Sequence, residues 1–71
     1  MERNYVESKA ITSIGYDTDN AILEIEFKSN GAPVWQYYDV PQYVYDEMMC
    51  AESQGTYFHA NIRGKYTESR V

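Results

Sequence analysis

Hydrophobic and polar positions alternate most regularly in the segment AILEIEF, residues 21–27. Its apolar members Leu23, Ile25 and Phe27 are separated by glutamates, which is a period of two. That period is typical of a β-strand with one buried face and one solvated face. We therefore predict a strand over residues 21–27 whose apolar face contacts a core.

The segment that precedes it, KAITSIGYD, residues 9–17, is rich in β-branched residues, which favour strands. The short polar loop DTDN connects the two segments, so the two strands should pair in antiparallel fashion. Gly15 inside the first strand indicates a bulge or a close approach of another backbone.

The segment that follows contains the dipeptide Asn30-Gly31, which is typical of a type I′ hairpin turn because both residues tolerate a positive φ. The return strand is predicted over residues 33–39. Pro33 stands at its start, and proline has no N–H for a strand ladder, so this strand should begin there or lie at a sheet edge. The three segments together predict a three-stranded antiparallel meander.

After Pro41 the hydrophobic period becomes helical. Pro41 suits the first turn of a helix, and Val44, Met48 and Ala51 follow at the spacing of one helix face. Gly55 is predicted to end this helix as a left-handed cap.

A second, short helix is predicted directly afterwards. Thr56 can cap it, Phe58 and Ile62 share one of its faces, and Gly64 ends it. The order is therefore β-β-β-α-α, an α+β domain whose two helices pack on one face of the sheet.

The aromatic stretch VWQYYDVPQYVY raises the question of which rings face solvent. In the predicted strand Trp35 and Tyr37 point to one side, and Tyr38 points to the other. Because helices cover only one face, we expect one of these two sets near solvent, and the sequence leaves open which one.

Composition and charge restrict the function. A chain of 71 residues forms one domain, and its formal net charge of −5 gives the whole chain no long-range attraction to nucleic acid. The last quarter differs, because Arg63, Lys65 and Arg70 are balanced there only by Glu68. The predicted domain therefore has a basic end on an acidic body.

The cysteine and histidine content argues against a fold that is stabilised by a disulfide or by a bound metal ion. Cys50 is the only cysteine, so no disulfide can form within the chain, and no ligand spacing for a metal is present. The charged N-terminus MERNYVESKA is no secretory signal, and no apolar run is long enough to span a bilayer. We expect a soluble, cytoplasmic protein with no metal, no cofactor and no membrane contact.

An ordered set of positions runs through most of the chain: an aromatic-x-Tyr pair, Val-Pro, Ala-x-Ser-x-Gly, Tyr-Phe, Ile-Arg and a late Tyr. These positions are Trp35, Tyr37, Val40, Pro41, Ala51, Ser53, Gly55, Tyr57, Phe58, Ile62, Arg63 and Tyr66. The set resembles the KTSC domain family, which is named for the C-terminal segment of some lysyl-tRNA synthetases and also occurs as short stand-alone bacterial and phage-type proteins.

The resemblance covers residues 8–66, which we take as the domain, with residues 1–7 and 67–71 as short flexible termini. Two positions depart from the family pattern: Trp35 stands where the family has Tyr, and His59 stands where it has Asn. The resemblance implies a small α+β module for which RNA binding has been suggested.

The candidate binding residues combine rings with positive charge, since rings stack on bases and Arg and Lys contact phosphate. An alternative is that Tyr57 and Tyr66 pack around Phe58 and Ile62 while Arg63 pairs with a carboxylate. No converging nucleophile, base and acid can be recognised, so we assign no catalytic residue and expect no enzyme. The candidate set is Trp35, Tyr37, Tyr57, Arg63, Lys65 and Tyr66.

Two functions are predicted. The first is a binding or adaptor module that uses an exposed aromatic face and an acidic surface, either with a protein partner or in self-association through the Pro33 strand edge or the Trp35–Tyr37 face. The acidic surface consists of Glu24, Glu26, Asp17 and Asp19, which can also be a solvated strand face. The alternative function is RNA or nucleotide binding by stacking and phosphate contacts.

Overall fold

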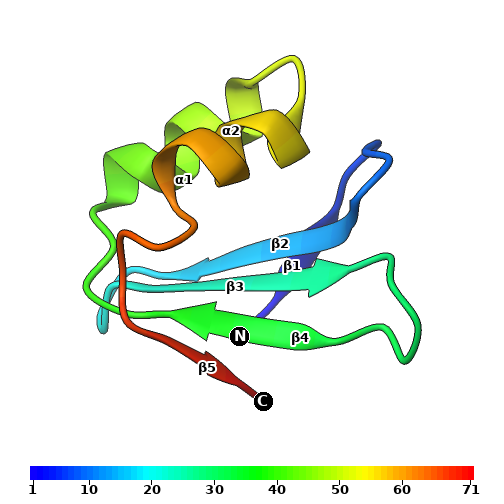
Figure 1. Ribbon diagram of the computed structural model, residues 1–71. Helices are drawn as coiled ribbons and strands as arrows, with labels where there is room; N and C mark the ends of the chain where they lie inside the picture. The colour runs from blue at the N-terminus through cyan, green and yellow to red at the C-terminus, as the bar shows by residue number, and fades with distance from the viewer.

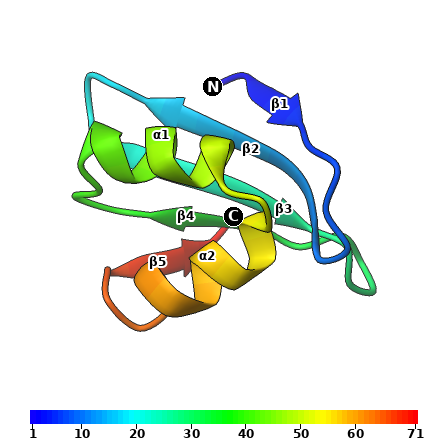
Figure 2. The same ribbon diagram turned by 90° about the horizontal axis from the view of Figure 1, so that it is seen from above.

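The computed structural model describes residues 1–71 as a five-stranded antiparallel sheet, in the order β1-β2-β3-β4-β5, with two helices on one face (Figures 1 and 2). The α+β class is confirmed. No helix is long and apolar enough to cross a bilayer. The elements are β1 Arg3–Tyr5, β2 Ile11–Asp17, β3 Ile22–Phe27, β4 Val34–Tyr37, α1 Gln42–Cys50, α2 Gln54–Asn61 and β5 Glu68–Arg70.

The predicted three-strand count is wrong, because β1 and β5 add a strand at each border of the sheet. Residues 3–5 and 68–70, expected in flexible termini, pair with β2 and β4 respectively. As a result β4 lies inside the sheet, and Pro33 marks the start of a strand but not a sheet edge. These strands are short and polar, so the sequence shows no hydrophobic period for them. They form because their backbone groups hydrogen-bond to the adjacent strand.

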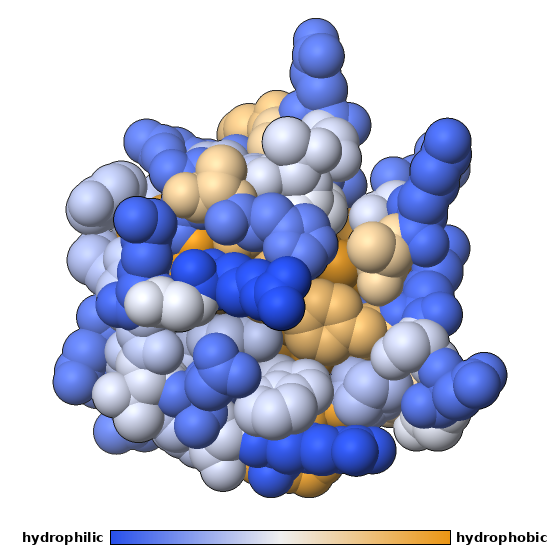
Figure 3. Space-filling model, in the orientation of Figure 1, coloured by the Kyte–Doolittle hydropathy of each residue, from blue (hydrophilic) through white to orange (hydrophobic).

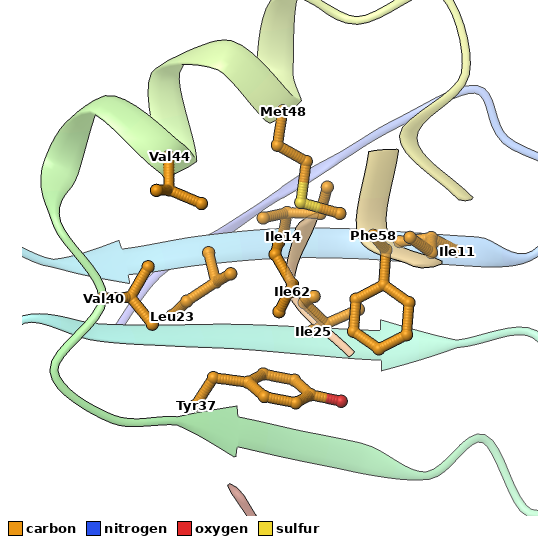
Figure 4. Close-up of a cluster of buried hydrophobic side chains, with 10 residues drawn as sticks. All are labelled: Ile11, Ile14, Leu23, Ile25, Tyr37, Val40, Val44, Met48, Phe58 and Ile62. Carbon is orange, nitrogen blue, oxygen red and sulfur yellow. The ribbon is translucent and has the colours of Figure 1, made fainter. Parts of the chain in front are cut away.

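The register of β3 and β4 decides which aromatic residues are covered. Tyr37 pairs with Leu23 and Trp35 pairs with Ile25, so all four side chains lie on the face that the helices cover. The predicted Leu23 face of β3 is therefore a core face, as expected. Ten side chains form this core (Figure 4): Ile11, Ile14, Leu23, Ile25, Tyr37, Val40, Val44, Met48, Phe58 and Ile62.

Aromatic contacts join the helices to the sheet. Phe58 of α2 makes edge-to-face contacts with Phe27 and Tyr37, at centroid distances of 5.2 and 5.5 Å. Tyr16 of β2 stacks on Tyr45 of α1 at 5.3 Å. Each pair of this kind contributes about 0.5–1.5 kcal/mol beyond its buried area, which helps a core of only ten buried hydrophobic residues.

The connection between β3 and β4 differs from the predicted type I′ turn. Gly31 and Ala32 have positive φ values of 82° and 43°, whereas Asn30 does not, and the Ala32 N–H donates to the Ser29 carbonyl at 2.9 Å. The type I′ prediction is therefore wrong. The Lys28 N–H donates to the Ala10 carbonyl at 2.9 Å, which continues the β2–β3 pairing one residue beyond the end of β3.

The helix ends are also shifted relative to the prediction. Ser53, not Thr56, caps α2, and its hydroxyl accepts a hydrogen bond from the Thr56 N–H. Gly55 consequently lies in the first turn of α2 and does not cap α1, which ends at Cys50. Gly64, which was predicted to end the second helix, follows the end of α2 at Asn61 and adopts a left-handed conformation, with φ at 76°.

At Gly15 another backbone segment approaches closely, which is one of the two possibilities that the sequence indicated. A Cβ on Gly15 would lie 2.4 Å from the backbone oxygen of Glu2, far below van der Waals contact. The missing side chain therefore lets the segment that enters β1 lie directly against β2.

Candidate binding surface at the β4–β5 edge

Trp35 lies on β4, opposite Arg70 of β5, and is half-buried against the core. Tyr37, two residues further, is only 2% exposed, so its ring belongs to the core and offers no stacking surface. The expectation that the Trp35–Tyr37 face is open for self-association is wrong, because this face carries the two helices. Only part of the Trp35 indole remains accessible.

Arg63 follows the C-terminal end of α2, and its N–H donates to the Phe58 carbonyl at 2.9 Å. Burial raises the pKa of Tyr37 to about 12; the charge of Glu68 adds to this, and the charge of Arg63 opposes it. Both charges therefore act on the Tyr37 hydroxyl from nearby. The Arg63 Nη1 lies 3.4 Å from the His59 Nδ1, and no carboxylate contacts it.

Three exposed basic residues lie in the segment from the end of α2 to β5, and we call them the basic rim: Arg63, Lys65 and Arg70. None makes an ion pair, because both ion pairs of the chain involve Arg3. Figure 3 looks onto α2 and the β4–β5 edge and shows strongly hydrophilic side chains beside exposed apolar surface. The rim thus carries positive charge without ion pairs, and its member Arg70 lies directly across from the half-buried Trp35.

Tyr57 and Tyr66 are not the exposed, unbonded rings that a stacking surface requires. The Tyr57 hydroxyl donates to the Glu47 carboxylate at 2.8 Å. Burial, this hydrogen bond, the Glu47 charge and the neighbouring Tyr43 and Tyr66 raise the Tyr57 pKa to about 12. Tyr66 is half-buried against the core. Both tyrosines therefore pack against the core, as the alternative proposed, but its second part is wrong, because Arg63 makes no ion pair.

The sheet face without helices carries a hydrogen-bonded polar network that sequence reasoning missed. The guanidinium of Arg3 contacts the carboxylate of Glu24, and its Nε donates to the Ser13 hydroxyl at 2.9 Å. Ser13 donates to Glu26 at 2.9 Å, and Gln36 donates to Glu24 at 2.8 Å. Glu24 and Glu26 therefore lie on the helix-free face, but the predicted solvated acidic surface is wrong for Glu24, which is nearly buried, and Arg3 offsets part of their charge.

A groove of about 550 Å³ lies between residues 7–10 and the first turn of α2. Its Ser53 hydroxyl accepts a backbone hydrogen bond, and its His59 contacts Arg63. The groove thus holds no hydrogen-bonded serine–histidine pair.

The comparisons with known proteins agree with this architecture. The KTSC domain model matches residues 7–66. A crystal structure of a KTSC domain protein from Yersinia pestis superposes with a TM-score of 0.93 and 40% identity, covering 99% of this chain and 96% of that one.

Sequence relatives extend the match. A protein from Tsukamurella paurometabola is 36% identical over 86% of this chain and 88% of its own length. A lysine–tRNA ligase from Trichormus variabilis is 37% identical over 84% of this chain, which is only 10% of the ligase. Because the family model spans nearly all of the sequence and the fold agrees, this chain belongs to the KTSC domain family.

Proposed function

We propose that this chain is a non-enzymatic binding module and that its ligand is single-stranded RNA. In this proposal Arg63 and Lys65 contact phosphate groups, and the accessible part of Trp35 stacks on a base. Base–aromatic stacking contributes about 1–3 kcal/mol per base, and the planar guanidinium of Arg63 suits phosphate.

The observation that carries the proposal is the free charge of Arg63 and Lys65. The chain has eleven acidic residues, yet neither side chain makes an ion pair. A cation left without a carboxylate partner is available for phosphate contacts at no cost in broken ion pairs. The net charge of −5 opposes long-range attraction, so we expect weak binding that decreases steeply with added salt.

The ligase relative supports the choice of RNA. Its printed name describes an enzyme that joins lysine to tRNA, and the matching segment is a small part of its length. A module attached to such an enzyme operates close to RNA.

Trp35 provides the test, because it is the only tryptophan in the chain. Titration with oligouridylate at low salt should quench its fluorescence, and the signal should decrease as salt increases. Arg63→Ala should weaken binding by about tenfold, in line with the loss of one charge-assisted phosphate contact. Lys9→Ala, which removes an exposed lysine beside the groove at α2, is the matched control and should change little. Absence of any fluorescence change at low salt refutes the proposal.

A protein partner is the second candidate, favoured by two highly exposed rings. Tyr5 is 84% exposed and Tyr43 is 62% exposed, and tyrosine is enriched at protein interfaces. Immobilised protein and its Tyr43→Ser variant should then retain different partners from a lysate. If wild type and Tyr43→Ser retain the same proteins, Tyr43 is not a contact residue. The same comparison with Tyr5→Ser tests the Tyr5 ring.

A further inference from the structure

The outer edge of β5 is open, and its hydrogen-bonding pattern is defined by two backbone contacts. The Tyr38 N–H donates to the Thr67 carbonyl, and the Val71 N–H donates to the Val34 carbonyl, both at 2.9 Å. In an antiparallel ladder alternate residues direct both backbone groups to the same neighbour. Residues 67, 69 and 71 therefore face β4, whereas Glu68 and Arg70 direct their N–H and C=O groups away from the sheet.

We propose that a second copy of this chain pairs in antiparallel fashion with β5, in the register that sets the two Ser69 residues opposite each other. Glu68 of each copy then lies opposite Arg70 of the other, and their outward N–H and C=O groups exchange hydrogen bonds. The interface is isologous, with the two-fold axis between the Ser69 residues and perpendicular to the sheet. Two five-stranded sheets become one continuous sheet with all helices on the same face.

The order of the charged residues along β5 favours this register over the other possible pairings of the two strands. Opposite charges directly across an antiparallel pair stabilise it, and like charges destabilise it. If the register shifts by two residues, Glu68 lies opposite Glu68 of the second copy and two carboxylates come together. A parallel pairing also places like charges side by side. Glu-Ser-Arg is therefore complementary to itself in one register only.

The opposite face of the strand fits the same register. Thr67 and Val71 lie on the helix-free side with Ser69, because they alternate with Glu68 and Arg70. Val71 is 61% exposed, and in the proposed pair it lies across from Thr67 of the second copy. Pairing therefore covers one of the few large apolar side chains that the single chain leaves exposed.

The other border of the sheet offers no equivalent match. There the outward backbone groups belong to Arg3 and Tyr5, because the Val6 N–H donates to the Thr12 carbonyl within the β1–β2 pair. Arg3 already contacts Glu24 and is not available for a second carboxylate. In Figures 1 and 2, β5 forms the border of the sheet with its outer side uncovered.

Sedimentation velocity in the absence of RNA tests the proposal independently of the proposed function. Short strands bury little surface, so we expect a dimer dissociation constant on the order of 100 µM, measured between about 10 µM and about 1 mM protein. Glu68→Arg and Arg70→Glu should each raise that constant by at least about tenfold, because each creates two like-charge contacts. The double variant, which exchanges the two charges, should restore the dimer.

A mixture of the two single variants gives the sharpest readout. It should dimerise although neither variant does so alone, since the mixture restores opposite charges at both positions. Lys9→Glu is the matched control: it makes the same change in net charge as Arg70→Glu at an exposed lysine outside the strand and should keep the dimer. A monomer at all concentrations, or equal constants for all variants, overturns the proposal.

Amide exchange provides a second measurement that does not depend on variants. The N–H groups of Glu68 and Arg70 should become protected as protein concentration increases, whereas Ser69 is already paired with β4. Rapid exchange of both amides at high concentration also overturns the proposal.

Discussion

The guanidinium of Arg3, in the N-terminal strand at the sheet border, contacts the carboxylate of Glu24 in the middle strand, on the face that no helix covers. Glu24 is only 7% exposed, so this charge depends on Arg3 and Gln36 for compensation. The contact therefore adds a side-chain interaction to the backbone pairing of β1 with β2 and helps to compensate a nearly buried carboxylate.

Arg3→Ala should destabilise the domain by about 1–3 kcal/mol, because it leaves a nearly buried carboxylate without its ionic partner. Urea denaturation measures the change. The double variant Arg3→Ala with Glu24→Gln should recover part of the loss, since no uncompensated charge remains. Equal stability of wild type and Arg3→Ala would show that the contact contributes nothing.

Stability should decrease in acid because of the same residue. Burial raises the pKa of Glu24, but hydrogen bonds from Gln36 and Arg3 and the Arg3 charge outweigh it, and the net pKa is below the ordinary 4.5. A lowered folded-state pKa means that this contribution is present above about pH 4.5 and is lost as the pH falls through the folded value. Urea denaturation from about pH 7 to about pH 3 should show a shallower acid dependence for Glu24→Gln. Identical slopes would contradict the assignment.

Stability should also decrease in strong base. Burial raises the Tyr37 pKa to about 12 from the ordinary 10.0, so the unfolded chain loses this proton before the folded one does. The neutral tyrosine therefore stabilises the fold fully below about pH 10, and the contribution is lost as the pH rises toward about 12. Tyr37→Phe keeps the ring in the core and should reduce the alkaline loss. Denaturation curves above about pH 9 that coincide for both proteins would be evidence against it.

Two glycine substitutions should have opposite signs. Gly15→Ala places a Cβ 2.4 Å from the Glu2 oxygen, so the chain entering β1 must shift, at a cost of about 1–3 kcal/mol. Gly55→Ala meets Ala10 at an ordinary 3.4 Å within a helix and should be neutral or stabilise by up to about 1 kcal/mol. Thermal denaturation of both variants measures the contrast. A stabilised Gly15→Ala variant would contradict the close approach.

The spacing of hydrophobic residues was sufficient to predict a strand or helix and its buried face where that element packs one side on the core. The alternation of Leu23, Ile25 and Phe27 predicted a strand and its buried face, and the helical spacing of Val44 and Met48 predicted α1, as the structure confirms. These predictions succeed because a strand repeats every two residues and a helix every 3.6, so burial leaves a periodic trace in the sequence.

The candidate site was predictable only in part. Arg63 and Lys65 are exposed and free of ion pairs, as a phosphate contact requires, whereas Tyr37 is buried and Tyr57 is bound to Glu47. The Arg3–Glu24 contact joins residues that are 21 positions apart, and no local signal connects them.

Local signals were thus enough for β2, β3, β4, both helices and the α+β class: hydrophobic periodicity for β3 and α1, β-branched content for β2, and turn or cap residues for β4 and α2. The pairing of distant strands decided everything else: that RNY and ESR are strands, that the Trp35 side of β4 lies under the helices, and that the basic rim reaches an open edge. The physical reason is that a hydrogen-bonded ladder orders its neighbour through main-chain groups, which every non-proline residue carries whatever its side chain.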